Sequence, residues 1–225
     1  MSSIPLRGDR KEQQADQGER TGRIGNGAVV YPGAHPVIDY KQKKTIQLDS
    51  KFIIAHFGSL GGVRHLGPFI EGLEAAIEQN SAMLEQISIH LYGSIGDDDR
   101  RRVADCMHSV FVLEGVLPRR EALAAMRRCD LLLLIQGRHQ ISAETIPSKL
   151  YEYLHVGRPV LALAHENHEI RELIEPLGHT CVSSEPDEIA RALTSLYSRW
   201  KTGAVAEILP SPYTVQDAVE RMLAL

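Results

Sequence analysis

The sequence is poor in cysteine and lacks an excess of basic residues, and each shortage excludes a class of protein. Its 225 residues include only three cysteines, Cys106, Cys129 and Cys181, whose spacing fits neither a metal site nor a disulfide framework. Cys129 and Cys181 adjoin or lie in apolar segments, so we expect buried free thiols and a reducing compartment. The net charge is −4 with a pI near 6.2, which argues against nucleic acid as a partner.

The chain also lacks a long apolar run. No stretch reaches the ~18 apolar residues that a membrane-spanning helix needs, so we expect no transmembrane segment. Residues 1–5 open a polar stretch without the apolar core of a secretion signal. These absences predict a cytoplasmic protein and leave open a peripheral contact with the inner face of a membrane.

The N-terminal region has the composition of a tail. Residues 1–27 are rich in Arg, Glu, Gln, Asp and Gly and almost free of large apolar residues, which predicts disorder. Residues 28–39 contain two X-Pro steps, which favour an extended segment over a helix. Hydrophobic residues make up 43% of the chain, enough for a sizeable core, and we expect a single domain over 28–225.

From residue 52 onward, strand and helix patterns alternate. Apolar runs predict strands at 52–57, 87–92, 110–113, 130–135, 159–164 and 180–183. Between and after them, helical patterns start near 66 and 97 and cover 119–128, 148–156, 169–177, 186–200 and 215–225. This alternation predicts an α/β fold with a doubly wound, Rossmann-like parallel sheet. Ligands bind such sheets at the carboxyl ends of the strands.

One such edge segment carries the strongest functional signal. In residues 144–164 a loop leads into a short helix, a Gly-Arg-Pro break and an apolar strand. The first residues of that helix are Ser148, Lys149 and Leu150. Backbone N–H groups and the positive end of the helix dipole make a helix start a natural anion site. We therefore expect these three residues to bind the phosphates of a nucleotide.

Two carboxylates accompany this lysine. Lys149 would neutralise a diphosphate, and Glu152, on the same helix face, would accept hydrogen bonds from ribose hydroxyls. Glu144 lies in the preceding loop, free to face a sugar. The simpler alternatives are a surface ion pair between Lys149 and Glu152 and a solvated charge at Glu144.

Glycines follow three of the predicted strands. Gly58 opens the loop Gly-Ser-Leu-Gly-Gly-Val-Arg, in which glycines permit close approach to a phosphate and Arg64 can pair with it bidentately. Gly93 and Gly115 end the next two strands and open onto the same edge. The loop lacks the Gly-x-Gly-x-x-Gly fingerprint of nicotinamide cofactors, and an ordinary strand-to-helix turn is the alternative.

Two acidic or histidine-rich motifs invite a metal interpretation. Asp97–Asp99 resembles an Asp-x-Asp motif, but acidic residues in a first turn also complement the helix dipole, which we favour. His165 and His168 are three residues apart rather than four, and no third ligand is nearby. We expect no metal site. The serines also lack the Gly-x-Ser-x-Gly elbow of a hydrolase.

Taken in order, these segments resemble the C-terminal, donor-binding half of a GT-B glycosyltransferase. The most similar family is the retaining group called glycosyl transferases group 1, or family 4, and the resemblance covers about 28–225. The separation of Glu144 and Glu152 matches the family's Glu-x7-Glu motif. The other matching segments are Phe57–Leu60, Leu91–Gly93, Leu113–Val116, Cys129–Leu134 and Pro147–Val160.

The resemblance implies a role for each matching residue. Glu144 would contact the donor sugar, and Glu152 the ribose. Arg64 and Lys149 would hold the pyrophosphate, and the turn Gly115–Val116 would contact the base. The donor would be a nucleotide-diphosphate sugar of the UDP or GDP type. No metal or other cofactor is implied, because basic side chains and helix-end amides stabilise the departing diphosphate.

The sequence departs from the family in two ways. Ile146 and Pro147 stand where the commoner form has Phe-Gly, and the proline removes a backbone donor. The acceptor-binding N-terminal half is absent, since the chain begins about where the interdomain linker would lie. Residues 201–225 resemble the tail that packs on that half, which would leave apolar positions partly exposed at Val215, Ala218, Val219, Met222 and Leu223.

The resemblance thus implies a donor-binding domain that transfers a sugar to an unknown acceptor together with a separate acceptor-binding chain. Self-association through 201–225 is a second way to cover the tail. Two other functions stay open. One is a non-catalytic nucleotide-sugar-binding module or truncated remnant, and the other is a GT-B-like epimerase acting on a sugar nucleotide.

Overall fold

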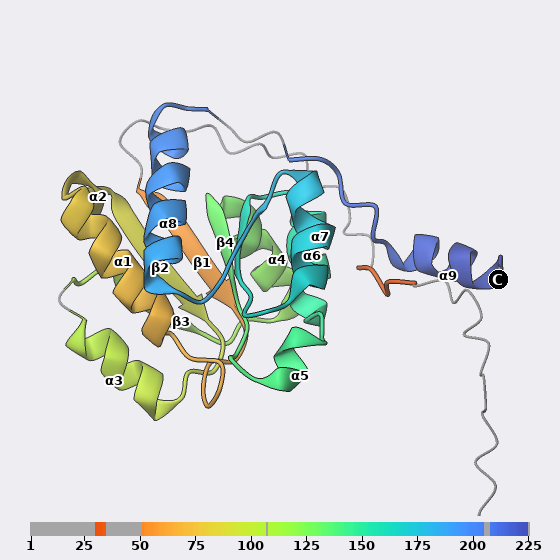
Figure 1. The fold of residues 1–225 in the computed structure, drawn as a ribbon, viewed down its shortest axis with the longest axis horizontal. Helices are drawn as coiled ribbons and strands as arrows, with labels where there is room; N and C mark the ends of the chain where they lie inside the picture. The colour runs from red at the N-terminus through yellow and green to blue at the C-terminus, as the bar shows by residue number, and fades with distance from the viewer. Residues whose placement is uncertain (1–29, 35–50, 107, 205–207, 225) are drawn as a thin grey trace, which may run out of the picture.

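The strands form one parallel sheet whose order reverses near its centre. The computed structural model describes residues 30–34, 51–106, 108–204 and 208–224, so the predicted disordered tail at 1–27 lies outside the described residues (Figure 1). The sheet order is β3-β2-β1-β4-β5-β6, and every neighbouring pair is parallel. This is the Rossmann order and confirms the predicted doubly wound α/β fold. The strands are β1 (Phe52–Phe57), β2 (Ile87–Tyr92), β3 (Phe111–Gly115), β4 (Leu131–Ile135), β5 (Val160–Leu163) and β6 (Thr180–Val182).

The predicted helices are all present, and the predicted boundaries of helices and strands agree with the structure to within two residues, except that α7 ends three residues before the predicted end. Two short helices, α2 and α5, were not predicted, because four or five residues are too few to show a helical period. The 3₁₀ turn η1 (Glu175–Leu177) continues the predicted helix at 169–177. The helices are α1 (Gly67–Gln79), α2 (Ala82–Gln86), α3 (Asp97–Asp105), α4 (Arg119–Arg128), α5 (Gln140–Ala143), α6 (Ser148–Val156), α7 (His168–Ile174), α8 (Pro186–Lys201) and α9 (Val215–Leu223).

Helices cover both faces of the sheet (Figure 1). On one face, α1 and α8 bury apolar side chains such as Leu73 and Leu193 against Ile54 of β1. On the other, α4, α6 and α7 pack against the next residue of β1, Ala55. Successive residues of a strand point to opposite faces, so both layers share one strand. Gly72 lets α1 approach α8, because a Cβ there would lie 2.6 Å from the Cβ of Ile189.

The cysteines agree with the sequence-based expectation. Cys129 and Cys181 are buried free thiols, and Cys106 is a partly buried one. Burial raises the pKa of the Cys181 thiol to about 11, so this sulfur stays protonated and unreactive at neutral pH. The Cys129 Sγ–H donates to the carbonyl of Ala125 within the same turn.

The C-terminal helix α9 lies away from the layered body (Figure 1). A parallel bridge between Ala34 and Thr214 anchors its start. The Tyr213 ring then meets Tyr31 at 5.5 Å and Tyr151 of α6 at 6.2 Å, both edge to face. Beyond this anchor the apolar side chains are exposed as predicted, with Leu223 84% accessible. Ala218 departs from the prediction, because it is buried.

The central strands β1 and β4 pair over only part of their length. Their register ends at Ala55 and Leu132, although both strands continue toward the carboxyl edge. Beyond this point each strand has backbone groups that its neighbour does not satisfy. A buried backbone N–H or C=O without a partner is costly, so side chains must supply the missing hydrogen bonds.

Two side chains fill the gap between β1 and β4 beyond Ala55 and Leu132, which we call the β1–β4 fork. The Tyr153 hydroxyl of α6 accepts from the Phe57 N–H at 2.8 Å, and it also lies 3.5 Å from the Leu133 carbonyl. From the other face, His56 places Nδ1 3.0 Å from the same Leu133 carbonyl. Because a carbonyl can only accept, Nδ1 carries the ring proton in the neutral histidine. Both side chains are buried, so the fork is sealed from solvent.

We predict that Tyr153→Phe destabilises the fold by about 1–3 kcal/mol, because it leaves the buried Phe57 N–H unsatisfied. Urea unfolding followed by circular dichroism measures this change. Tyr151→Phe on the same helix is the matched control, because the Tyr151 hydroxyl has no hydrogen-bond partner among the described residues. Equal midpoints for Tyr153→Phe and wild type would contradict the role of this hydroxyl.

Two buried histidines make the fold sensitive to acid. Burial, aided by the positive charges of Arg64 and Lys149 and opposed by the bond to Leu133, lowers the pKa of His56 to about 4. Burial alone lowers the pKa of His179 to about 4. Each ring therefore resists the proton that it takes up readily in the unfolded chain, where the pKa is near 6.5.

We predict that stability is complete above pH 6.5 and falls as the pH drops from 6.5 toward 4. The folded-state pKa values are the lower ones, so protons bind preferentially to the unfolded chain in this window. At pH 5 the loss is on the order of 1–2 kcal/mol per histidine. Unfolding midpoints at pH 7.5 and 5 measure it. His179→Leu should make this dependence shallower, and an unchanged dependence would refute the contribution of His179.

Candidate nucleotide-binding site

The three predicted edge glycines lie in a row across the strand ends. The Gly58 N–H donates to the Tyr92 carbonyl, next to Gly93, and the Gly93 N–H donates to the Gly115 carbonyl at 2.7 Å. A Cβ on Gly93 would lie 2.1 Å from the Gly58 carbonyl oxygen, and φ at Gly93 is 125°. Only glycine allows this contact and this φ. The loops after β1, β2 and β3 thus form one continuous backbone surface.

Arg64 stands at the end of a tight turn in the first of these loops. The Gly61 N–H donates to the Arg64 carbonyl at 2.8 Å, and the Arg64 N–H returns a bond at 3.2 Å. The turn rests on the loop that follows β4, since a Cβ on Gly137 would lie 2.6 Å from the Val63 carbonyl oxygen. The Arg64 side chain is exposed. This packing holds the Arg64 turn at the carboxyl ends of β1 and β4.

Helix α6 starts on the same edge. Pro147 is its N-cap residue, and Ser148 is exposed at the first helical position. Leu150 differs from its neighbours, because its side chain is fully buried in the core and its N–H donates to the Pro147 carbonyl at 2.9 Å. The structure therefore leaves the helix start itself at Ser148 and Lys149 and uses Leu150 for packing.

Glu152 is held by two cations. Lys149 Nζ lies 2.6 Å from its Oε2, and Arg119 Nε of α4 lies 3.1 Å from its Oε1. The carboxylate is 19% exposed, against 36% for Lys149 and 58% for Arg119. Burial by itself would raise the pKa of Glu152, but the bonds and charges of the two cations outweigh it and lower the pKa. Glu152 is thus ionised and oriented.

The ion pair of Lys149 and Glu152, which the sequence offered as an alternative to ligand binding, is therefore present. Arg119 was not predicted as a site residue. Its signal in the sequence is its position, directly after the turn at Gly115–Val116 and at the start of a helix on the ligand edge. That turn is exposed, and φ at Gly115 is 75°.

The loop that carries Glu144 is fixed by two buried amides. The Gln136 side chain donates to the Thr145 carbonyl at 2.7 Å. The Asn167 side chain donates to the carbonyls of Ser142 and Thr145 at 2.8 and 3.0 Å. Glu144 itself is exposed at the end of α5. Its backbone is positioned while its carboxylate stays open to a ligand.

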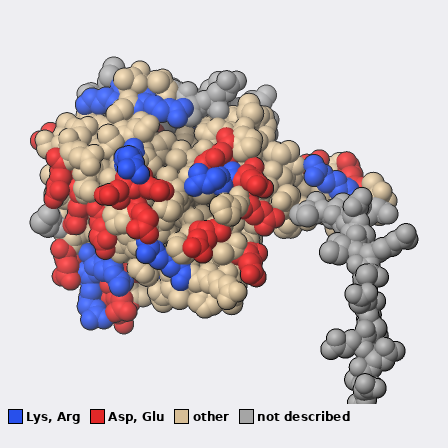
Figure 2. Space-filling view, viewed as in Figure 1, with Lys and Arg blue, Asp and Glu red and all other residues tan. Residues whose placement is uncertain are grey.

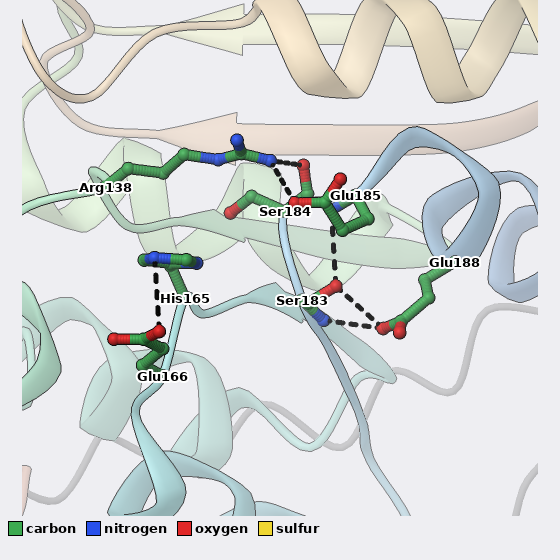
Figure 3. A network of polar contacts seen from close by, with 7 residues as sticks. All are labelled: Arg138, His165, Glu166, Ser183, Ser184, Glu185 and Glu188. Atoms are coloured by element: carbon green, nitrogen blue, oxygen red, sulfur yellow. Dashed lines mark hydrogen bonds and ion pairs between the residues drawn. The ribbon is translucent and has the colours of Figure 1, made fainter.

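A further network closes the edge on the side of β6 (Figure 3). Arg138, from the loop after β4, donates to the Ser184 carbonyl at 2.6 Å and to Glu185 at 2.7 Å. Glu188 at the start of α8 accepts from both the N–H and the hydroxyl of Ser183, which lowers the pKa of its carboxyl. These contacts tie the β4 and β6 loops together beside the Glu144 loop.

The motifs that suggested a metal have other partners. Asp99 is fully buried in the first turn of α3, where it accepts from the Leu66 N–H at 2.9 Å and pairs with Arg102. His165 lies near Glu166, at 3.9 Å (Figure 3). Within the described part of the chain, no group of three or more His, Cys, Asp or Glu side chains gathers to hold a metal ion.

One arrangement on the β2–β3 side has the distances of a hydrolase triad. Ser88 Oγ lies 3.0 Å from His90 Nε2, and His90 Nδ1 lies 2.7 Å from Glu114 Oε1. Ser88, however, stands inside β2, where backbone N–H groups serve the sheet. An oxyanion hole needs free donors converging beside the nucleophile. The trio is therefore better explained as a polar ladder on the outer strands than as a catalytic site.

On the face shown in Figure 2, acidic and basic side chains are interspersed. Among the described residues, no helix is both long and apolar enough to cross a membrane.

Comparison with known proteins identifies the fold. No protein-family model and no curated protein match the sequence. Among solved structures, S. aureus TarM in a complex that includes UDP is similar over 84% of this chain and 37% of its own, with a TM-score of 0.53 and 15% identity. A putative UDP-N-acetylglucosamine 2-epimerase from Listeria monocytogenes is similar over 81% and 47%, with a TM-score of 0.50 and 16% identity.

A third solved structure is matched over almost its whole length. The catalytic domain of cholesterol-alpha-glucosyltransferase from Helicobacter pylori is similar over 78% of this chain and 97% of its own, with a TM-score of 0.52 and 14% identity. The chain spans less than half of TarM and of the epimerase. At these identities the likeness establishes the architecture. The chain has the Rossmann-like fold of one half of a GT-B glycosyltransferase.

Proposed function

We propose that this domain binds the sugar donor of a retaining, family 4-like glycosyltransferase, a nucleotide-diphosphate sugar of the UDP or GDP type. The observation that carries the proposal is the placement of Arg64, Lys149 and Glu152 at the carboxyl edge of the sheet, beside the β1–β4 fork. In doubly wound sheets, ligands bind where the strand order reverses. The site joins cations for a diphosphate with a carboxylate for a ribose.

Each part of the donor has a candidate partner. The diphosphate would lie over the glycine surface, between Arg64 and the start of α6 with Lys149. The ribose hydroxyls would donate to Glu152, and the base would contact Gly115–Val116. The sugar would face Glu144.

The proposed chemistry is sugar transfer with retention of configuration. The bond between the anomeric carbon and the diphosphate oxygen breaks, and its electron pair leaves with the diphosphate. The acceptor oxygen forms the new bond on the same face of the sugar, and its proton passes to the departing diphosphate oxygen. Arg64, Lys149 and the dipole of α6 would stabilise the charge that develops on the leaving group, and we expect no metal to be needed.

An epimerase acting on a nucleotide sugar is the second candidate, favoured by the likeness to the putative 2-epimerase. A non-catalytic module is the third, and it would use the same donor site without turnover. Incubation with UDP-N-acetylglucosamine separates these functions, because an epimerase inverts C2 without an acceptor. A transferase domain would instead need a partner that supplies the acceptor.

We predict that the chain binds UDP in calorimetric titration without added metal and that Lys149→Ala weakens binding about tenfold or more, since a cation on the diphosphate is lost. Arg64→Ala should have a similar effect. Lys201→Ala is the matched control, because Lys201, at the end of α8, contacts Gln86 of α2 and has no part in the proposed site. A chelator should leave the affinity unchanged. A folded sample without saturable binding would refute the donor site.

The acceptor would come from a separate chain docked on α9. Val219, Met222 and Leu223 form an exposed apolar face on this helix, with exposures of 49%, 65% and 84%. A face of this kind on a helix that lies away from the body is typical of an interaction surface. Self-association through the same face is the alternative.

We predict that the double variant Met222→Asp with Leu223→Asp binds UDP with unchanged affinity but loses association through α9. Light scattering during size-exclusion chromatography of wild type and variant measures the oligomeric state. A wild-type oligomer that dissociates in the variant would show self-association in place of a separate partner. A variant with weakened UDP binding would contradict the separation of α9 from the donor site.

A further inference from the structure

We propose that Arg119 is a positioning residue that holds Glu152 for ribose recognition when Lys149 turns to the diphosphate. This inference rests on the proposed function. It begins from the two oxygens of Glu152, each of which has a different cation. Oε2 contacts Lys149 Nζ at 2.6 Å, and Oε1 contacts Arg119 Nε at 3.1 Å. Arg119 belongs to α4, whereas Lys149 and Glu152 share α6.

A diphosphate would compete with Glu152 for the charge of Lys149. Its ammonium is a point charge on a flexible chain, and 36% of the side chain is exposed, so it can move to a stronger anion. When it does so, Glu152 loses one of its two cations. The carboxylate is mostly buried, and burial disfavours its charged form. A second cation must remain if Glu152 is to stay ionised and in place.

Arg119 is suited to this task. A guanidinium stays charged at any physiological pH, and its rigid planar group fixes the direction of its hydrogen bonds. The contact is made by Nε and leaves the two terminal nitrogens of the guanidinium out of it. Arg119 also follows Gly115–Val116 by only a short turn, which links the proposed base contact to the proposed ribose contact.

The consequence is measurable as discrimination between nucleotides. Glu152 can favour UDP over 2′,3′-dideoxyuridine diphosphate only through the ribose hydroxyls, since the base and the phosphates are identical. Hydrogen bonds to a charged group are strong enough for a preference of about tenfold or more. If Arg119 positions Glu152, then removing Arg119 must reduce this preference without equally reducing affinity for the dideoxy compound.

The experiment is calorimetric titration of both nucleotides into wild type, Arg119→Ala and Arg119→Lys. In Arg119→Ala we expect the preference for UDP to fall to about threefold or less, with dideoxy binding changed by less than about twofold. Arg119→Lys should restore part of the preference, because it returns the charge without the planar group. Arg171→Ala is the matched control, since Arg171 forms an exposed ion pair with Glu175 of comparable length, 2.7 Å, on α7.

The outcomes separate this inference from the function on which it rests. If wild type binds neither nucleotide, the donor site itself is refuted. If wild type binds UDP through Lys149 but Arg119→Ala keeps the full preference, the role of Arg119 is refuted and the donor site stands. Equal loss of affinity for both nucleotides in Arg119→Ala also overturns the inference, because it would indicate a phosphate contact or a general loss of structure.

Discussion

The structure depends on how the fork between β1 and β4 is closed. A sheet whose strand order reverses must open a crevice there, and the crevice exposes backbone groups that cost free energy when buried without partners. Tyr153 and His56 supply those partners at the Phe57 N–H and the Leu133 carbonyl. Because Tyr153 belongs to α6, its bond to β1 also fixes the rotation of that helix. Lys149 and Glu152, on the neighbouring turn, are thereby directed to the ligand edge.

On the other side of the fork, close backbone packing fixes the loops that carry the glycines and Arg64. Gly58, Gly93 and Gly115 are joined across the strand ends, and Gly137 receives the turn that carries Arg64. Side chains at Gly93 and Gly137 would hold the loops apart. Because glycines stand there, the loops after β1, β2 and β3 form one continuous backbone surface, and Arg64 and Lys149 lie beside it. Packing in the core fixes both this backbone surface and the start of α6, so the site is already formed in the structure.

The sequence predicts the parts of this arrangement that leave a local signal. Apolar runs and helical periods reveal the strands and the longer helices, and the order Gly58, Gly93, Gly115 reveals the edge. Helices α2 and α5 could not be predicted because five and four residues are too few to show a repeating helical pattern. Arg119, Gln136 and Asn167 escape for a different reason, since their partners at Glu152, Thr145 and Ser142 lie on other elements. Leu150 is the opposite case: its position in the motif suggested a contact with the ligand, but its side chain packs in the core.

The charges of the proposed site follow a simple balance. Arg64, Lys149 and Arg119 are cationic and Glu144 and Glu152 are anionic, so the three cations exceed the two carboxylates and leave a net positive site on a chain of negative net charge. A diphosphate bound there would enter a field of the opposite sign, and its binding would exchange the Lys149–Glu152 pair for a stronger one. Without Arg119, that exchange would leave the mostly buried Glu152 carboxylate without a cation. In the proposed site, Lys149 would neutralise the diphosphate while Arg119 holds the carboxylate that contacts the ribose.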